Sequence, residues 1–231
     1  MSPETRPGTT EEPTTAHGPV HTLRTTCRGC GGQDLHRFLE LGAMPLANAL
    51  LDSADDLAGE ARYPLDVYFC ESCALVQLLD VIDPEVLFGH YLYVTGTSDT
   101  MAAHNRDYAR TVAGLLGLGA DDLVVEVASN DGSLLKEFKA LGPRVLGVEP
   151  ARNIAAMASE AGIRTLNRFF DSGAASEIRE EYGPASAVLA NNVLAHVDAT
   201  QDFLAGCRTL VEPDGMVIVE VPYLQELVDR L

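Results

Sequence analysis

The segment VVEVASNDG, residues 124–132, decides the fold class. Its first half is apolar and β-branched, which predicts a buried strand, and its second half is a short polar loop. In an open parallel sheet, the loop after the first strand lies at the carboxyl edge, where ligands bind. A dinucleotide site would need the pattern G-x-G-x-x-G, but this loop has one late glycine, Gly132, after Asn130 and Asp131. The loop therefore predicts a site for a charged ligand that is not held through a phosphate.

Strands and helices alternate through the region around this segment. Apolar strands separated by helices predict a parallel sheet that is covered on both faces. The expected strands are residues 122–128, 144–150, 163–170, 185–192 and 216–222, and the expected helices are residues 101–119, 133–141, 153–162, 173–183, 200–211 and a last one from about Tyr223. A turn is expected at EPDG, residues 212–215. The pattern predicts an α/β domain with about five strands.

Two glutamates belong to the predicted strands. Glu126 is the only charge within the apolar run of its strand, residues 123–128, and a buried carboxylate there needs a partner such as a loop amide or a ligand ammonium. Glu149, followed by Pro150, ends the next strand, where an acidic group can take both hydroxyls of a ribose. A glutamate at a strand end can equally be a solvated edge residue. We interpret the ordered set of strand, Glu126, loop and Glu149 as a nucleotide-type site.

Four cysteines form a second pattern, C-x2-C, 39 residues, C-x2-C, made by Cys27, Cys30, Cys70 and Cys73. Each pair places two thiolates on one tight knuckle, which favours a tetrahedral zinc ion. The alternatives are disulfides, which a chain without an export signal does not favour, and a redox motif, which does not need a second copy. Four thiolates fill the coordination shell, so we expect a structural zinc ion. Cys207 is expected to be a core thiol.

Composition divides the chain into four expected parts. These are a disordered tail (1–22), a zinc-binding domain (23–82), a linker loop with a helix (83–120) and the parallel-sheet domain (121–231). His17 and His21 fall in the tail and are expected to be solvated rather than metal ligands.

Charge and hydropathy limit the partners. The formal net charge of -18 repels phosphate backbones and anionic lipid, so we expect neither nucleic acid nor a membrane as a partner. No apolar run approaches the roughly 20 residues that cross a bilayer, and the N-terminus lacks the layout of a signal peptide. These features predict a soluble cytoplasmic protein.

The sequence resembles the S-adenosylmethionine (SAM)-dependent sugar C-methyltransferases that act on nucleotide-linked keto-deoxysugars. The resemblance runs from about Cys27 to Leu231 and rests on ordered motifs. These are CRGCGG (27–32), LELGAMPLANALL (39–51), YFCESCALVQL (68–78), YLYVTGTS (91–98), EVASNDGSLL (126–135), GVEP (147–150), ANNVLAHV (190–197) and VEVPYL (219–224). The resemblance implies a zinc domain followed by a Rossmann-like class I methyltransferase sheet, with SAM as cofactor.

The resemblance also implies roles for individual residues. Cofactor contacts would come from Glu126, Asn130, Asp131, Gly132, Glu149, Pro150 and Asn191. His196 and Tyr93 would be catalytic and face the sugar, with Asn192 and Tyr91 as substrate contacts. From the residues alone, His196 could instead pack on Val193 and Val197, and Tyr93 could be a packed loop tyrosine. Ala128 stands where methyltransferases usually carry glycine.

The implied reaction is methylation of a carbon beside a ketone, typically C3 of a 4-keto sugar linked to a nucleotide such as dTDP. A base removes the acidic proton next to the carbonyl, and polar groups stabilise the enolate.

The chain departs from the family pattern at its C-terminal end. A Tyr-x-Glu-His motif that follows VEVPYL in the family, and supplies catalytic groups, is not reached before Leu231. Five strands are expected where a methyltransferase sheet has seven, which would leave an uncovered edge. We expect a truncated piece of a longer enzyme. The alternatives are completion by a second chain or by dimerisation, a cofactor- or sugar-binding protein without catalysis, a zinc-dependent adaptor, and an NAD-type enzyme.

Overall fold

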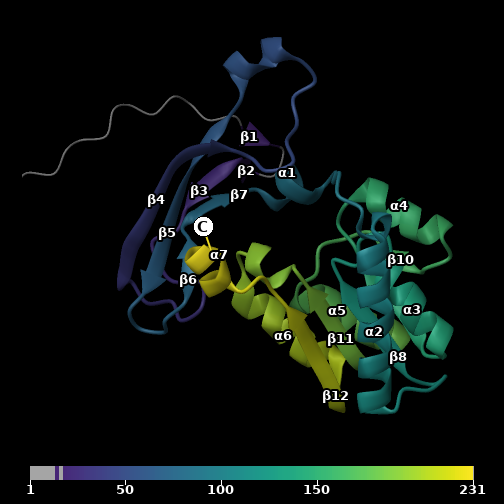
Figure 1. Cartoon of the computed structure of the whole chain (residues 1–231). Coiled ribbons are helices and arrows are strands. Elements are labelled where there is room, and N and C mark those ends of the chain that lie inside the picture. The colour runs from purple at the N-terminus through teal and green to yellow at the C-terminus, as the bar shows by residue number, and fades with distance from the viewer. Residues whose placement is uncertain (1–13, 16–17, 231) are drawn as a thin grey trace, which may run out of the picture. The chain divides into compact units, whose positions relative to one another are not determined.

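The computed structural model describes residues 14–15 and 18–230 (Figure 1). The chain divides into two compact units, the first ending at Leu87 and the second beginning at Phe88. None of the helices in the described residues is long and apolar enough to span a membrane.

The first unit is built from short antiparallel sheets. Strand β5 (Arg62–Cys70) pairs with β4 (Leu35–Pro45) and β6 (Val76–Leu78). The remaining elements are β1 (Thr14–Thr15), β2 (Gly18–Pro19), β3 (His21–Leu23), η1 (Ala54–Gly59), β7 (Asp80–Ile82) and α1 (Pro84–Phe88), which runs into the second unit. Most side chains of β4 are exposed, and the buried apolar residues described in this unit are Val20, Cys27, Cys70 and Leu79. So small a core needs a metal or another cross-link to be stable.

Residues 18–22 differ from the predicted tail. Strand β3 pairs with β7, and the buried Val20 lies just before it. His21 Nε2 lies 2.8 Å from Asp80 Oδ1, and only 15% of the histidine side chain is exposed. Asp80 supplies a polar partner and β7 supplies strand hydrogen bonds, so this stretch is ordered although its composition is that of a tail. Residues 1–13 and 16–17, with the prediction for His17, lie outside the described residues.

The second unit is a parallel five-stranded sheet with the order β10-β9-β8-β11-β12. Its strands are β8 (Leu123–Val127), β9 (Arg144–Val148), β10 (Thr165–Leu166), β11 (Ala185–Asn191) and β12 (Val211–Glu220). Its helices are η2 (Thr95–Thr97), α2 (Asp99–Leu116), α3 (Ser133–Leu141), α4 (Arg152–Glu160), α5 (Ser172–Tyr182), η3 (Leu194–His196), α6 (Thr200–Leu210) and α7 (Leu224–Arg230). The predicted α/β class, five strands and parallel sheet are confirmed.

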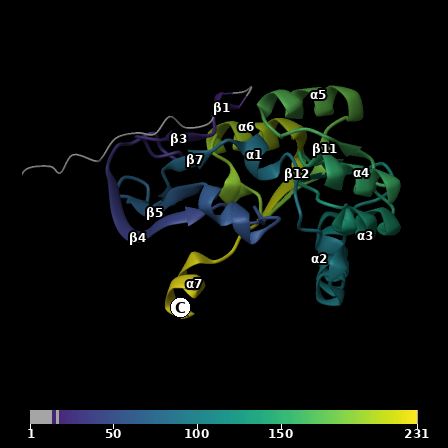
Figure 2. The same ribbon diagram turned by 90° about the horizontal axis from the view of Figure 1, so that it is seen from above.

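Helices cover both faces of this sheet, because side chains of β8 alternate between two apolar clusters. Leu123, Val125 and Val127 pack with Phe203 and Leu210 of α6 and with α5. Val124, on the other face, packs with the second cluster, which contains Val112 of α2, Phe138 of α3 and Ala158 of α4. Figure 2 shows α5 and α6 on one side of the strands and α2 and α3 on the other.

Strand β12 departs from the prediction at one point. The expected turn at residues 212–215 lies within the strand as a bulge, because Ala185 pairs with Val211 and Ala187 pairs with Met216. Gly215 is required here, since a Cβ would lie 2.9 Å from the carbonyl oxygen of Ser186. β12 is the last strand in the order. Val219 near its end and Val221 just after it are 39% and 48% exposed.

Candidate active site and metal centre

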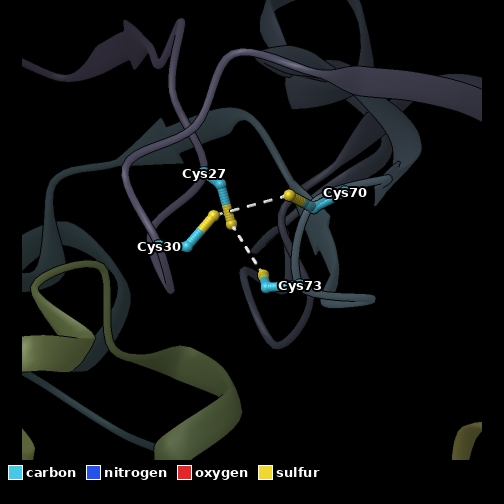
Figure 3. A group of neighbouring side chains, drawn as sticks. All are labelled: Cys27, Cys30, Cys70 and Cys73. Atoms are coloured by element: carbon cyan, nitrogen blue, oxygen red, sulfur yellow. Dashed lines mark hydrogen bonds between the residues drawn. The ribbon is translucent and has the colours of Figure 1, made fainter.

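The four predicted zinc ligands come together in the first unit (Figure 3). The Sγ–Sγ distance is 3.6 Å from Cys27 to Cys73 and from Cys30 to Cys70, and all four sulfurs lie within 4.8 Å of one another. Zn–S bonds of about 2.3 Å in a tetrahedron place the sulfurs about 3.8 Å apart. The donor set and its spacing therefore fit one zinc ion with four thiolate ligands.

Two matching knuckles create this arrangement. In the first, Gly31 N donates to the Cys27 carbonyl at 2.8 Å, and in the second, Ala74 N donates to the Cys70 carbonyl at 2.8 Å. Gly31 and Ala74 both have left-handed backbone, with φ of 75° and 61°. Glycine adopts this conformation without a steric penalty in the first turn, whereas the second turn strains an alanine.

The sulfur of Cys27 accepts hydrogen bonds from two neighbouring N–H groups. Gln77 Nε2 donates to its Sγ at 3.0 Å, and Gly29 N donates at 3.3 Å. Burial raises the pKa of this thiol, but hydrogen bonds from the Cys30 backbone, Gln77 and Gly29 lower it further, so that the pKa falls to about 6. A thiolate, the form that binds metal, is therefore favoured at this position. Sequence reasoning did not identify Gln77, whose side chain lies on β6 far along the chain.

In the second unit, the loop after β8 has unusual backbone. Ala128, Asn130 and Gly132 all have positive φ, at 56°, 50° and 74°. The value at Ala128 gives a physical reason for the glycine that the resemblance implies at this position, because left-handed backbone costs alanine roughly 1 kcal/mol. Gly132 is also required by space, since a Cβ there would lie 3.0 to 3.1 Å from side-chain atoms of Ile163.

Two buried polar side chains near this loop have unsatisfied atoms. Glu126 Oε2 and Ser129 Oγ are buried and have no hydrogen-bond partner within residues 14–15 and 18–230. Burial raises the pKa of Glu126 well above its usual range, with smaller contributions from the charges of Asp131 and Glu149. Buried polar groups in native proteins are nearly always hydrogen-bonded, so these two atoms indicate a place for a ligand.

Glu149 lies against the same loop. Its Oε2 accepts a hydrogen bond from Asn130 N at 2.9 Å, and its Oε1 accepts one from Ala151 N at 2.8 Å. Burial raises the pKa of Glu149, and these two backbone hydrogen bonds oppose the increase. The next residue, Pro150, has its carbonyl bound by Asn167 Nδ2 at 2.9 Å. The carboxylate is thus held in a fixed orientation beside the loop.

Residues 91–98, the segment with the motif YLYVTGTS, also meet this loop. The side chain of Asn130 bonds the backbone of Tyr93 and Thr95, and Asp131 accepts a bond from Gly96 N. Tyr91 is held from α4, where Asn153 bonds both its N–H and its carbonyl. The Tyr93 side chain is 52% exposed.

Polar groups at the ends of β11 and β12 form a further cluster. Tyr108 OH donates to Asn191 Oδ1 at 3.1 Å, and burial raises the pKa of this tyrosine to about 12. Asn192 Nδ2 donates to Glu220 Oε1 at 3.1 Å, while His104 Nε2 lies 3.2 Å from Glu220 Oε2. Sequence reasoning missed Tyr108, His104 and Glu220. Glu220 could have been found from its position at the end of a strand, whereas nothing in the sequence around Tyr108 and His104, both on α2, marks them as site residues.

His196 lies in η3, just after β11. Its ring is 5.7 Å from the ring of Phe88. The residue is exposed by its surface area, but the surrounding protein partly desolvates the imidazole, and this lowers its pKa. The neighbouring Val193 and Val197 pack on the core of the sheet. The imidazole is therefore favoured in its neutral form, which can accept a proton.

Comparisons with known proteins agree with this geometry. Residues 101–230, more than half of the chain, match the methyltransferase domain family, and the chain belongs to this family. Residues 27–88 match a family described as "Putative zinc binding domain". The predicted class I methyltransferase sheet, its cofactor SAM and the structural zinc ion are therefore confirmed.

Among individual proteins, the chain is similar to C-methyltransferase NovU from Streptomyces niveus. The two are 42% identical over 201 residues, which are 87% of this chain and 48% of NovU. It is also similar to a ubiquinone biosynthesis O-methyltransferase from Rhodopseudomonas palustris (strain HaA2). The two are 32% identical over 99 residues, which are 42% of this chain and 38% of that protein. The crystal structure of the PH0226 protein from Pyrococcus horikoshii OT3 has a TM-score of 0.47 and 15% identity, covering 64% of this chain and 63% of that one. The chain thus spans about half the length of NovU, and a smaller share of the other curated relative.

Proposed function

We propose that this chain carries the cofactor- and zinc-binding parts of a SAM-dependent C-methyltransferase. Its substrate would be a nucleotide-linked 4-keto-deoxysugar, with dTDP as the nucleotide, methylated at C3 through an enolate. The similarity to NovU supports C-methylation. The observation that carries the proposal is the convergence of Glu126, Glu149 and the 91–98 segment on one loop at the carboxyl edge of the sheet.

The residues at this edge fit SAM. Glu126, with an unsatisfied buried oxygen, would pair with the ammonium of the cofactor, and the fixed Glu149 carboxylate would accept both ribose hydroxyls. Asn191 would contribute its free Nδ2, because its Oδ1 is taken by Tyr108. When bound, SAM supplies an electrophilic methyl group on a sulfonium.

On the sugar side, the chain offers a base and a donor. The neutral imidazole of His196 would accept the proton that leaves C3, and the C–H electron pair would become the enolate. The phenol of Tyr93 would donate to the enolate oxygen, with Tyr91 and Asn192 as sugar contacts. The segment 91–98 would hold the sugar against the cofactor, and such placement supplies much of the rate.

Calorimetry with S-adenosylhomocysteine (SAH) and with NAD tests the cofactor assignment. We expect heat of binding with SAH and none with NAD. Binding of NAD without binding of SAH would overturn the proposal and favour an NAD-type enzyme.

Deuterium exchange tests the chemistry separately from methyl transfer. A dTDP-linked 4-keto-deoxysugar incubated with the SAH-bound chain in D₂O should lose its C3 proton faster than with buffer. His196→Gln should abolish the acceleration, and His36→Gln, a change at an exposed histidine of the first unit, should not. Exchange that is equally fast in His196→Gln would remove His196 from the role of base.

A further inference from the structure

The side chains of Asn130 and Asp131 are both engaged by the segment 91–98. Asn130 Oδ1 accepts a hydrogen bond from Thr95 N at 2.9 Å, and its Nδ2 donates to the Tyr93 carbonyl at 3.1 Å. Asp131 Oδ2 accepts from Gly96 N at 3.0 Å. Three hydrogen bonds thus join a loop that borders the cofactor site to the segment that carries Tyr93.

The chemistry of Asn130, Asp131 and Gly96 suits these three hydrogen bonds. An asparagine amide has one acceptor and one donor end, and here each end meets a complementary backbone group of the segment 91–98. Asp131 uses its second oxygen, Oδ1, to accept from Ser133 N at 3.2 Å at the start of α3. Only glycine admits this contact without rearrangement, because a Cβ at residue 96 would clash with Asp131 Oδ2.

Asn130 also touches the cofactor side through its backbone. Its N–H donates to Glu149 Oε2 at 2.9 Å, so one residue contacts both the carboxylate expected to hold the ribose and the backbone on either side of Val94. Asn130, whose backbone is left-handed with φ of 50°, thus lies between Glu149 and residues 93–95 and contacts both.

We propose that Asn130 and Asp131 are positioning residues for the segment 91–98, and that binding of the cofactor restrains this segment and so places Tyr93. Their side chains serve the sugar side of the site, and Asn130 contacts the cofactor side only through its N–H. The inference rests on the proposed function, since it takes SAM as the ligand beside Glu149.

A single tryptophan can report on the segment. The chain has no tryptophan, and Leu92 is 53% exposed beside Tyr93, so Leu92→Trp introduces a unique fluorophore. Quenching of this fluorophore by acrylamide is measured with and without saturating SAH. We expect SAH to protect the tryptophan, and we expect this protection to be lost in Asn130→Ala and in Gly96→Ala, which breaks the same junction from the other side.

Asn153→Ala is the matched control. Asn153 holds the same segment at Tyr91, with hydrogen bonds of 3.1 and 2.7 Å, but lies on α4 outside the loop. This variant should raise quenching both with and without SAH while keeping the protection by SAH. Circular dichroism establishes that each variant is folded, and calorimetry establishes that each binds SAH.

The outcomes are distinguishable. Absence of SAH binding to the parent Leu92→Trp protein would refute the proposed function itself. SAH binding without protection of the tryptophan, or protection that persists in folded Asn130→Ala and Gly96→Ala, would overturn the positioning role. Loss of SAH binding in Asn130→Ala with binding retained in Gly96→Ala would show that the Asn130 side chain contacts the cofactor directly, and would also overturn it.

Discussion

Glu126→Gln removes the only charge of β8 while keeping the size of the side chain, and it should separate stability from cofactor binding. Burial raises the pKa of Glu126 in the folded state. The unfolded chain therefore releases this proton at lower pH than the folded chain does, and folding stability falls as pH rises above about 4.5 until the folded-state pKa is reached. Within that window the loss is about 1.4 kcal/mol per pH unit, and glutamine has no such loss.

Glu126→Gln should stabilise the fold at high pH, but it should weaken the binding of the cofactor. A charge-assisted hydrogen bond between the Glu126 carboxylate and a ligand ammonium is worth about 1.5 to 3 kcal/mol. Its loss should weaken SAH binding by about 10- to 150-fold. The variant should thus gain stability relative to the parent as pH rises from 5 to 8, and lose most of its cofactor affinity.

Urea denaturation at pH 5 and pH 8, with zinc present, measures the first effect, and calorimetry with SAH at pH 8 measures the second. Glu160→Gln, an exposed change at the end of α4, is the matched control and should alter neither. An SAH affinity within twofold of the parent in folded Glu126→Gln would refute the pairing with the ammonium. A stability advantage of the variant that shrinks with rising pH would refute the raised pKa.

Three further predictions concern other parts of the chain. Metal analysis should find about one zinc per chain, and Cys27→Ser should lose it, unfold the first unit and weaken substrate binding while SAH binding largely survives; simultaneous loss of SAH binding would contradict this. His196 should titrate below pH 6.5 by NMR because partial desolvation disfavours its charged form, and a midpoint above 6.5 would contradict the neutral base. Gly206→Ala should destabilise the protein by about 1 to 3 kcal/mol, because its Cβ would lie 2.9 Å from the Asp171 carbonyl oxygen. Gly114→Ala in α2, which has open space, should be neutral or stabilising in the same denaturation experiment.

The features that could be predicted from the sequence are those with a local signal. The cysteine pairs have the spacing of zinc knuckles, and Glu149 directly follows an apolar strand, so the position of each could be predicted from its neighbours. The same reasoning predicts that Asn130 and Asp131 lie in the loop after β8, and they do. How their side chains are used could not be predicted, because Asn130 bonds Thr95 across 35 residues of sequence.

Long-range register explains the other differences. Composition predicts that His21 belongs to a tail, but its partner Asp80 is 59 residues away on a paired strand. Asn192 meets Glu220 across 28 residues because β11 and β12 are neighbours in the sheet. The expected turn at residues 212–215 became a bulge for the same reason, since pairing with β11 begins again immediately beyond it. Such contacts depend on which strands are adjacent, and composition does not encode that.

The five cysteines allow the two units to be followed by simple thiol chemistry. Cys207 is 2% exposed on α6, and burial raises its pKa to about 11, so its thiol reacts slowly while the second unit is folded. The other four are the zinc ligands, and a thiol that is bound to the metal is protected from the reagent. A colorimetric thiol reagent should therefore find almost no fast-reacting groups in the zinc-loaded protein and up to four after chelation. The thiol of Cys207 should react only when the sheet unfolds. The number of reactive thiols in the native chain therefore reports metal loss first and unfolding of the second unit afterwards.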